Sequence, residues 1–173
     1  MRPDVVALDA LAAEIVRLDA LAQLPADATG TLREQGGFTR IWVDTLENLV
    51  GIVETLASAV FHAAVSNADQ ILNGKGAIFQ RLEGTADLFV ANGYPDLRQR
   101  LDLATWQRLL QTWATRHAFT HRDGVVDAKY LTAVPSSPAQ LGQRLTVTEQ
   151  QTRLAISNSR ELCTAIATLI STP

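Results

Sequence analysis

Apolar residues recur at spacings of three and four along most of the chain, which is the period of an amphipathic α-helix. The first such stretch covers residues 4–22, and Asp4 is the expected N-cap of this helix. Pro25 ends the helix, and we expect a loop over 26–30, while residues 31–37 give no defined pattern. The inward positions of this first helix are Leu8, Leu11, Ile15 and Leu18.

The longest helical pattern follows over residues 38–72. A single helix of about 35 residues would measure roughly 52 Å at 1.5 Å per residue, which is long for a globular protein. Gly51 is a candidate bend, and Ser66-Asn67 is a candidate earlier end. We interpret the apolar stripe of this segment as a central core helix rather than a cofactor site. Its members are Ile41, Trp42, Leu49, Ile52, Val53, Leu56 and Val60.

A short glycine-containing segment, N-G-K-G at 73–76, indicates a helix stop and a turn. A phosphate-binding loop is the alternative, but the segment lacks the spacing of that motif and a preceding strand. A third helix is expected over 77–91, and Asn92-Gly93 closes it. Its inward residues are expected to be Ile78, Phe79, Leu82, Leu88 and Phe89.

Acidic residues mark the next two helix starts. A short helix is expected over 97–101, after which Asp102 is a suitable N-cap for a helix over 103–121. Asp123-Gly124 predicts a turn, because glycine accepts positive φ and aspartate bonds to nearby backbone. Asp127 then caps a short helix over 128–133.

The last part of the chain predicts a loop followed by one more long helix. Pro135 and Pro138 bracket the loop, and the weak alternation over 143–147 indicates extended backbone. Thr148 and Gln151 form a capping box at the start of the final helix. The chain therefore predicts an all-α fold, an antiparallel bundle of four long helices with short additional helices.

Composition narrows the class of protein. Of the 173 residues, 47% are apolar and 19% are charged, values typical of a globular domain. We expect one domain over 1–173, with an N-terminal helix and loop at 1–36 and the bundle at 37–173. Cys163 is the only cysteine, which excludes an internal disulfide and suits a reducing compartment. With no membrane segment or signal peptide evident, we expect a cytoplasmic protein without membrane contact.

Candidate chemistry is concentrated in residues 113–131, W-A-T-R-H-A-F-T-H-R-D-G-V-V-D-A-K-Y-L. Arg116, His117 and His121 fall within six residues. His117 and His121 are two of the three histidines in the chain. The Asp-Gly turn follows at once. The sequence therefore places a basic, titratable cluster at the exposed end of a helix.

Two interpretations of this cluster need no RNA. In a structural interpretation, the histidines interact favourably with the helix C-terminus and Arg116 pairs with Asp123. In a zinc interpretation, the i, i+4 histidines bind the metal, as two histidines on one helix face can do. That site would need a third ligand, such as Asp123, Asp127 or the distant His62.

A third interpretation is metal-independent cleavage of a phosphodiester. A histidine with a pKa near 6.5 can exchange a proton with a ribose 2′-OH, and an arginine fork offsets charge on the phosphate. The whole chain carries a net charge of −3, so RNA binding would depend on a local patch. Residues 98–129 hold six basic and three acidic residues, a local excess of +3. The candidate RNA-binding residues are Arg108, Arg122 and Lys129.

A family resemblance favours this third interpretation. The string R-H-A-F-T-H at 116–121 resembles the R-x4–6-H motif of HEPN domains. The longer run R-H-A-F-T-H-R-D-G-V-V-D-A-K-Y-L at 116–131 is similar to the extended form in many bacterial members, where the histidine leads into an Asp-Gly or Asn-Gly turn. The segment G-K-G-A-I-F-Q-R-L at 74–82 also resembles such proteins.

The resemblance implies a helical bundle that forms a homodimer with its two motifs facing each other. It implies a metal-independent endoribonuclease that needs no cofactor and leaves a 2′,3′-cyclic phosphate and a 5′-hydroxyl. Arg116 would stabilise the scissile phosphate, His121 would act as acid or base, and His117 would orient the phosphate. Many active relatives carry Asn or Asp at the position of His117.

Relatives of this kind often act as toxins or phage-defence effectors. Some are silenced by a nucleotidyltransferase-type antitoxin, so the resemblance implies such a protein or another regulator as a partner, besides RNA. Other relatives keep the fold as a non-catalytic module that binds a protein or a nucleotide, or that dimerises. The same motif is therefore compatible with a ribonuclease and with a non-catalytic module.

Overall fold

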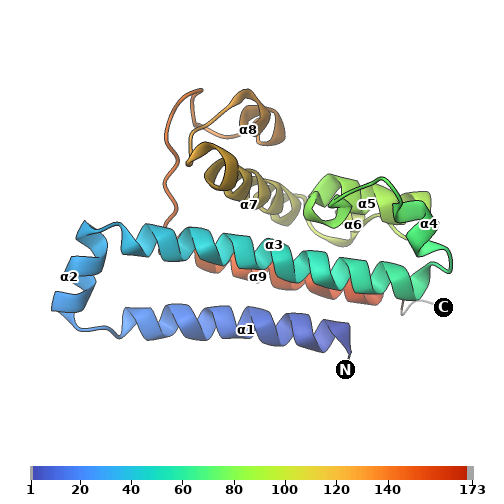
Figure 1. Cartoon of the computed structure of the whole chain (residues 1–173), viewed down its shortest axis with the longest axis horizontal. Coiled ribbons are helices and arrows are strands. Elements are labelled where there is room, and N and C mark those ends of the chain that lie inside the picture. The colour runs from blue at the N-terminus through green and yellow to red at the C-terminus, as the bar shows by residue number, and fades with distance from the viewer. Residues whose placement is uncertain (1, 171–173) are drawn as a thin grey trace.

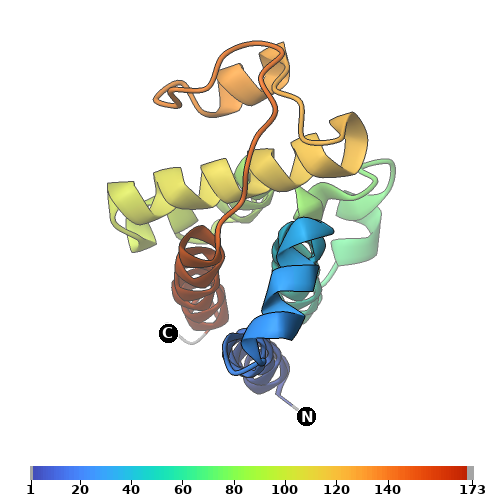
Figure 2. The same ribbon diagram turned by 90° about the vertical axis from the view of Figure 1, so that its left-hand side faces the viewer.

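Three long helices lie side by side and a fourth crosses over them (Figures 1 and 2). The computed structural model describes residues 2–170. Helices α3 (Gly37–Ala64) and α9 (Glu149–Thr168) run in the same direction, and α1 (Pro3–Ala22) runs opposite to both. Helix α7 (Leu103–Arg122) crosses α3 and α9 obliquely. The prediction of an all-α bundle with four long helices and short additional ones is confirmed; α1 is antiparallel to α3 and α9, as expected, whereas α3 and α9 are parallel to each other.

The core lies between these helices, where each presents one apolar stripe. Removal of that surface from water is the main stabilising contribution to such a bundle. Residues without measurable exposure come from all four long helices: Leu11, Leu49, Phe61, Leu109, Leu162 and Ile166. The stripes predicted from the three-four spacing are therefore the faces that pack together.

The predicted caps at α7 and α9 are present. The Asp102 carboxylate accepts a hydrogen bond from the Thr105 N–H at 2.9 Å. At α9, the Thr148 hydroxyl accepts from the Gln151 N–H at 3.2 Å, and the Gln151 side chain accepts from the Thr148 N–H at 2.9 Å. The capping box therefore fixes where α9 begins.

Thr148→Ala is expected to lower the free energy of unfolding by about 1 kcal/mol, because the Gln151 N–H loses its acceptor at the helix start. Urea denaturation measures the change. Thr164→Ala, an exposed threonine inside the same helix, is the matched control and should change stability by less than about 0.5 kcal/mol. Equal losses in both variants would contradict the role of the cap.

Two predictions about the N-terminal region were wrong. Residues 26–30, expected to be a loop, belong to helix α2 (Ala26–Glu34), because Pro25 at its N-cap ends one helix and starts the next. Arg2 rather than Asp4 is the N-cap of α1, because Pro3 occupies the first helical position. Asp4 lies in the first turn and pairs with Arg2 at 2.6 Å.

Two longer segments divide where a single helix was expected. The 38–72 pattern breaks after Ala64, where Val65 is extended, and resumes as α4 (Ala68–Leu72), near the candidate end at Ser66-Asn67. The 77–91 segment begins as η1 (Ile78–Gln80), and α5 (Leu82–Ala91) starts after an extended Arg81. The break accompanies the packing of Phe79 against Phe61, with ring centroids 5.8 Å apart.

Two short helices complete the chain. Helix α6 (Leu97–Arg100) precedes α7, and α8 (Ala128–Ala133) follows it. Over residues 143–147, the expected extended backbone is limited to one antiparallel bridge between Val125 and Arg144. None of the helices within residues 2–170 is both long enough and apolar enough to cross a membrane.

Candidate functional site

The end of α7 is fixed by the Asp-Gly turn. Asp123 and Gly124 both have left-handed backbones, with φ of 53° and 75°. The Gly124 N–H donates to the Ala118 carbonyl at 3.0 Å, which satisfies an otherwise free helix end. A Cβ at Gly124 would lie 2.7 Å from the Phe119 ring, so only glycine fits there without a shift. His121 is thereby held in the last turn of α7.

A small second core attaches α8 to this end of α7. It consists of Ala118, Val126, Tyr130 and Val134, each at most 5% exposed. The Asp127 carboxylate caps α8 by accepting from the Tyr130 N–H at 2.9 Å, and this hydrogen bond lowers the pKa of Asp127. The start of α8 is therefore placed beside the motif of α7.

His117 and His121 lie together on the exposed surface, as their i, i+4 spacing predicts. Their ring centroids are 4.5 Å apart, with the planes tilted by 57°. The pKa of His117 is lowered, first by partial desolvation and then by the neighbouring His121, with Asp127 opposing the shift. The lowered pKa of His117 favours its neutral imidazole, in which one ring nitrogen is a hydrogen-bond acceptor.

The lowered pKa of His117 predicts a pH dependence of stability. Its unfolded pKa is near 6.5, so on acidification the unfolded chain binds a proton before the folded chain does. The free energy of unfolding should therefore fall as the pH drops from about 7 through 6.5 and below. His117→Asn should make this fall shallower in urea titrations at a series of pH values. An unchanged pH profile in the variant would contradict the assignment.

Arg116 lies on a different face of α7 from the histidines. At 100° per residue it is about 140° from His121 around the helix, and it faces α3. One turn further on, Thr120 donates a hydrogen bond to Glu47 of α3. The Arg116 side chain is half-buried, and its Nε is buried with no hydrogen-bond partner within residues 2–170. Within one chain, the structure joins the two histidines and holds Arg116 on the neighbouring face.

The predicted RNA-binding residues separate into two places. Arg122 and Lys129 are exposed near the histidines, and the Arg122 Nε lies 3.6 Å from Asp127. Arg108 lies two turns before Arg116, away from the histidines, and lines a cavity on another side of α7. Arg98, counted in the local basic excess, is neutralised by three carboxylates at 2.7–3.0 Å, from Asp96, Asp87 and Glu83.

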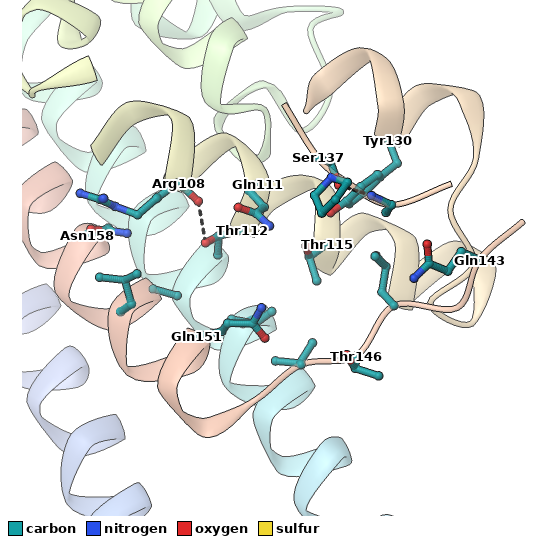
Figure 3. A pocket seen from close by; sticks show the side chains of 17 residues that line it. Arg108, Gln111, Thr112, Thr115, Tyr130, Ser137, Gln143, Thr146, Gln151 and Asn158 are labelled. Atoms are coloured by element: carbon teal, nitrogen blue, oxygen red, sulfur yellow. Dashed lines mark hydrogen bonds between the residues drawn. The ribbon is translucent and has the colours of Figure 1, made fainter. Parts of the chain in front are cut away.

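The sequence prediction missed a cavity of about 360 Å³ on another side of α7 (Figure 3). Four polar residues of α7 line it at three-four spacing: Arg108, Gln111, Thr112 and Thr115. Asn158 of α9 and the loop over 137–147 complete its wall. The polar stripe along α7 is the sequence signal that could have indicated this cavity.

Comparisons of the chain with family models, curated proteins and solved structures found no match. Any assignment of chemistry therefore rests on the residues themselves. Among residues 2–170, no three His, Cys, Asp or Glu side chains are grouped closely enough to hold a metal ion. No third ligand is therefore grouped with His117 and His121 among residues 2–170, and a zinc site there would need one from elsewhere.

Proposed function

We propose that this chain is a HEPN-like, metal-independent endoribonuclease that acts as a homodimer. The observation that carries the proposal is the exposed His117–His121 pair at the end of α7, with centroids 4.5 Å apart. Arg116 adds a guanidinium whose Nε has no partner among the described residues, and Arg122 and Lys129 add positive charge at the same end. This combination suits a phosphodiester.

The proposed reaction is an attack of a ribose 2′-OH on the adjacent phosphate. A histidine accepts the 2′-OH proton, and the bond to the 5′-oxygen breaks as that oxygen receives a proton. His121 is the proposed acid or base, and neutral His117 orients the phosphate by a hydrogen bond. Arg116 offsets the charge on the phosphate oxygens. The products are a 2′,3′-cyclic phosphate and a 5′-hydroxyl.

A dimer with facing motifs is part of this proposal. Arg116 and His121 lie about 140° apart around one helix, so one chain does not surround a phosphate with both groups. A second copy facing the first would bring its own histidines and arginine to the other side of the RNA. Light scattering on the purified protein should give the mass of two chains, and a strict monomer at high concentration would contradict the arrangement.

The test of the activity is cleavage of total RNA by purified protein in the presence of EDTA. We expect cleavage with EDTA, and product ends that resist 3′ ligation until the cyclic phosphate is removed. Cleavage that stops when EDTA is added, or products with 3′-hydroxyl ends, would contradict the proposed chemistry. A toxin or phage-defence role, with a nucleotidyltransferase-type antitoxin or other regulatory protein as partner, follows from the same proposal. It is tested by expression with and without the His121→Ala change.

A further inference from the structure

We propose that the cavity between α7, α8, α9 and the 137–147 loop binds a small organic anion, a phosphate or carboxylate on a compact apolar body. The cavity-lining residues of α7 lie about 150° around the helix from His117 and His121. The site is therefore distinct from the proposed nuclease site, and the proposal does not depend on nuclease activity.

The cavity is preformed and of ligand size. Its volume of about 360 Å³ falls within the usual range for small-molecule sites. The loop that covers it is fixed at two points: the Leu145 N–H donates to the Gly124 carbonyl at 2.8 Å, and the Val126 N–H donates to the Gln143 carbonyl at 2.9 Å. The wall of the cavity is therefore formed before any ligand binds.

Arg108 supplies the only formal charge among the side chains that line the cavity. Its Nε is buried without a hydrogen-bond partner, and its Nη2 makes one long contact, 3.4 Å to the Thr105 hydroxyl. Among residues 2–170 it forms no ion pair within 4 Å, although the pKa of Asp102 is lowered by a hydrogen bond from the Thr105 hydroxyl and, less strongly, by the charge of Arg108. A buried donor without an acceptor is costly, and a guanidinium fork matches a phosphate or carboxylate.

Asn158 is the second polar group at this end of the wall. It is 2% exposed, and its side-chain amide borders the cavity. Its side chain lies at the same end of the cavity as Arg108 (Figure 3). Both side chains carry N–H donors and border this end of the cavity.

The remaining lining explains why the ligand should be anionic and partly apolar. No lining residue is acidic, so nothing in the wall would attract a cation. Apolar surface comes from seven lining residues, and the side chains other than these and Arg108 offer amides and hydroxyls. The apolar residues are Leu46, Pro138, Ala139, Leu145, Val147, Leu154 and Ala155. An anion with an apolar body satisfies both the donors and this surface.

The test is an NMR titration of the full chain with phenyl phosphate and with benzoate, using benzylamine as the cationic comparison. We expect saturable shifts of the Asn158 side-chain amide and the Arg108 Nε–H with a Kd of about 1 mM for such small probes. Tighter binding of phenyl phosphate would identify a phosphate ester as the ligand class, and tighter binding of benzoate a carboxylate. Benzylamine should cause neither shift.

Two variants of cavity residues and one control test whether the anions bind in this cavity. Arg108→Gln should raise the Kd of the tighter-binding anion at least about tenfold, because the charge-assisted hydrogen bonds are lost. Asn158→Ala should raise this Kd as well, and it keeps the test valid should Arg108→Gln fail to fold. Arg160→Gln, an exposed arginine on α9, is the matched control and should bind as the unmodified chain does. No saturable shift with either anion at about 10 mM, equal shifts with benzylamine, or unchanged binding in both cavity variants would overturn the proposal.

Discussion

His121→Ala is expected to lower the rate of RNA cleavage by about 10²–10⁴-fold while the bundle stays folded. The expected loss is large because the side chain is the proposed proton donor or acceptor. The fold should survive because His121 is exposed, and its one described ring contact is with His117. Single-turnover cleavage gives the rate, and thermal unfolding followed by circular dichroism gives the stability.

Arg116→Ala should produce a similar loss, about 10²–10³-fold, through lost stabilisation of the phosphate charge. The matched control for the histidine is His62→Ala, which removes an exposed imidazole near the end of α3. There His62 contacts the Ser58 carbonyl at 2.7 Å and Asp69 at 3.2 Å. Cleavage by this control should be unchanged. Cleavage that survives both His121→Ala and Arg116→Ala would exclude this site as the catalytic centre.

The helices that the sequence predicted well are those whose ends are determined locally. Asp102, Asp127 and Thr148 each accept a hydrogen bond from an N–H three residues further on, so a short window contains the whole signal. Helix α2 was missed because its sequence contains Gly30 and follows Pro25, both of which favour a loop when read alone. Helix α2 lies against α3, although none of its residues is fully buried.

At the candidate site too, contacts between residues close in sequence were predictable, and contacts between distant segments were not. The His117–His121 contact was predictable because it lies within one helix. The neutralisation of Arg98 was not, because Glu83 and Asp87 come from α5 and are 15 and 11 residues away. The cavity was missed for the same reason: Arg108 and Asn158 are 50 positions apart in the sequence, and a loop between them closes the wall.

Phe61→Ala is expected to lower the free energy of unfolding by about 3–5 kcal/mol, the largest stability loss proposed for this chain. The Phe61 ring has no measurable exposure, and it packs against Phe79 and Phe89 with centroids 5.8 and 5.6 Å apart. Removing it leaves a void where α3 meets η1 and α5, and Phe79 and Phe89 each lose an aromatic contact. Urea denaturation measures the loss.

Phe38→Ala is the matched control, because Phe38 is only half-buried and stacks on Trp42 at the other end of α3. It should cost about 1 kcal/mol, and an equal loss in the two variants would contradict the assignment of Phe61 to the core. Neither phenylalanine lines the cavity at α7 or contacts the His117–His121 pair. While Phe61→Ala remains folded, its RNA cleavage and anion binding should therefore match those of the unmodified chain. This separates the stability of the bundle from the chemistry at the end of α7.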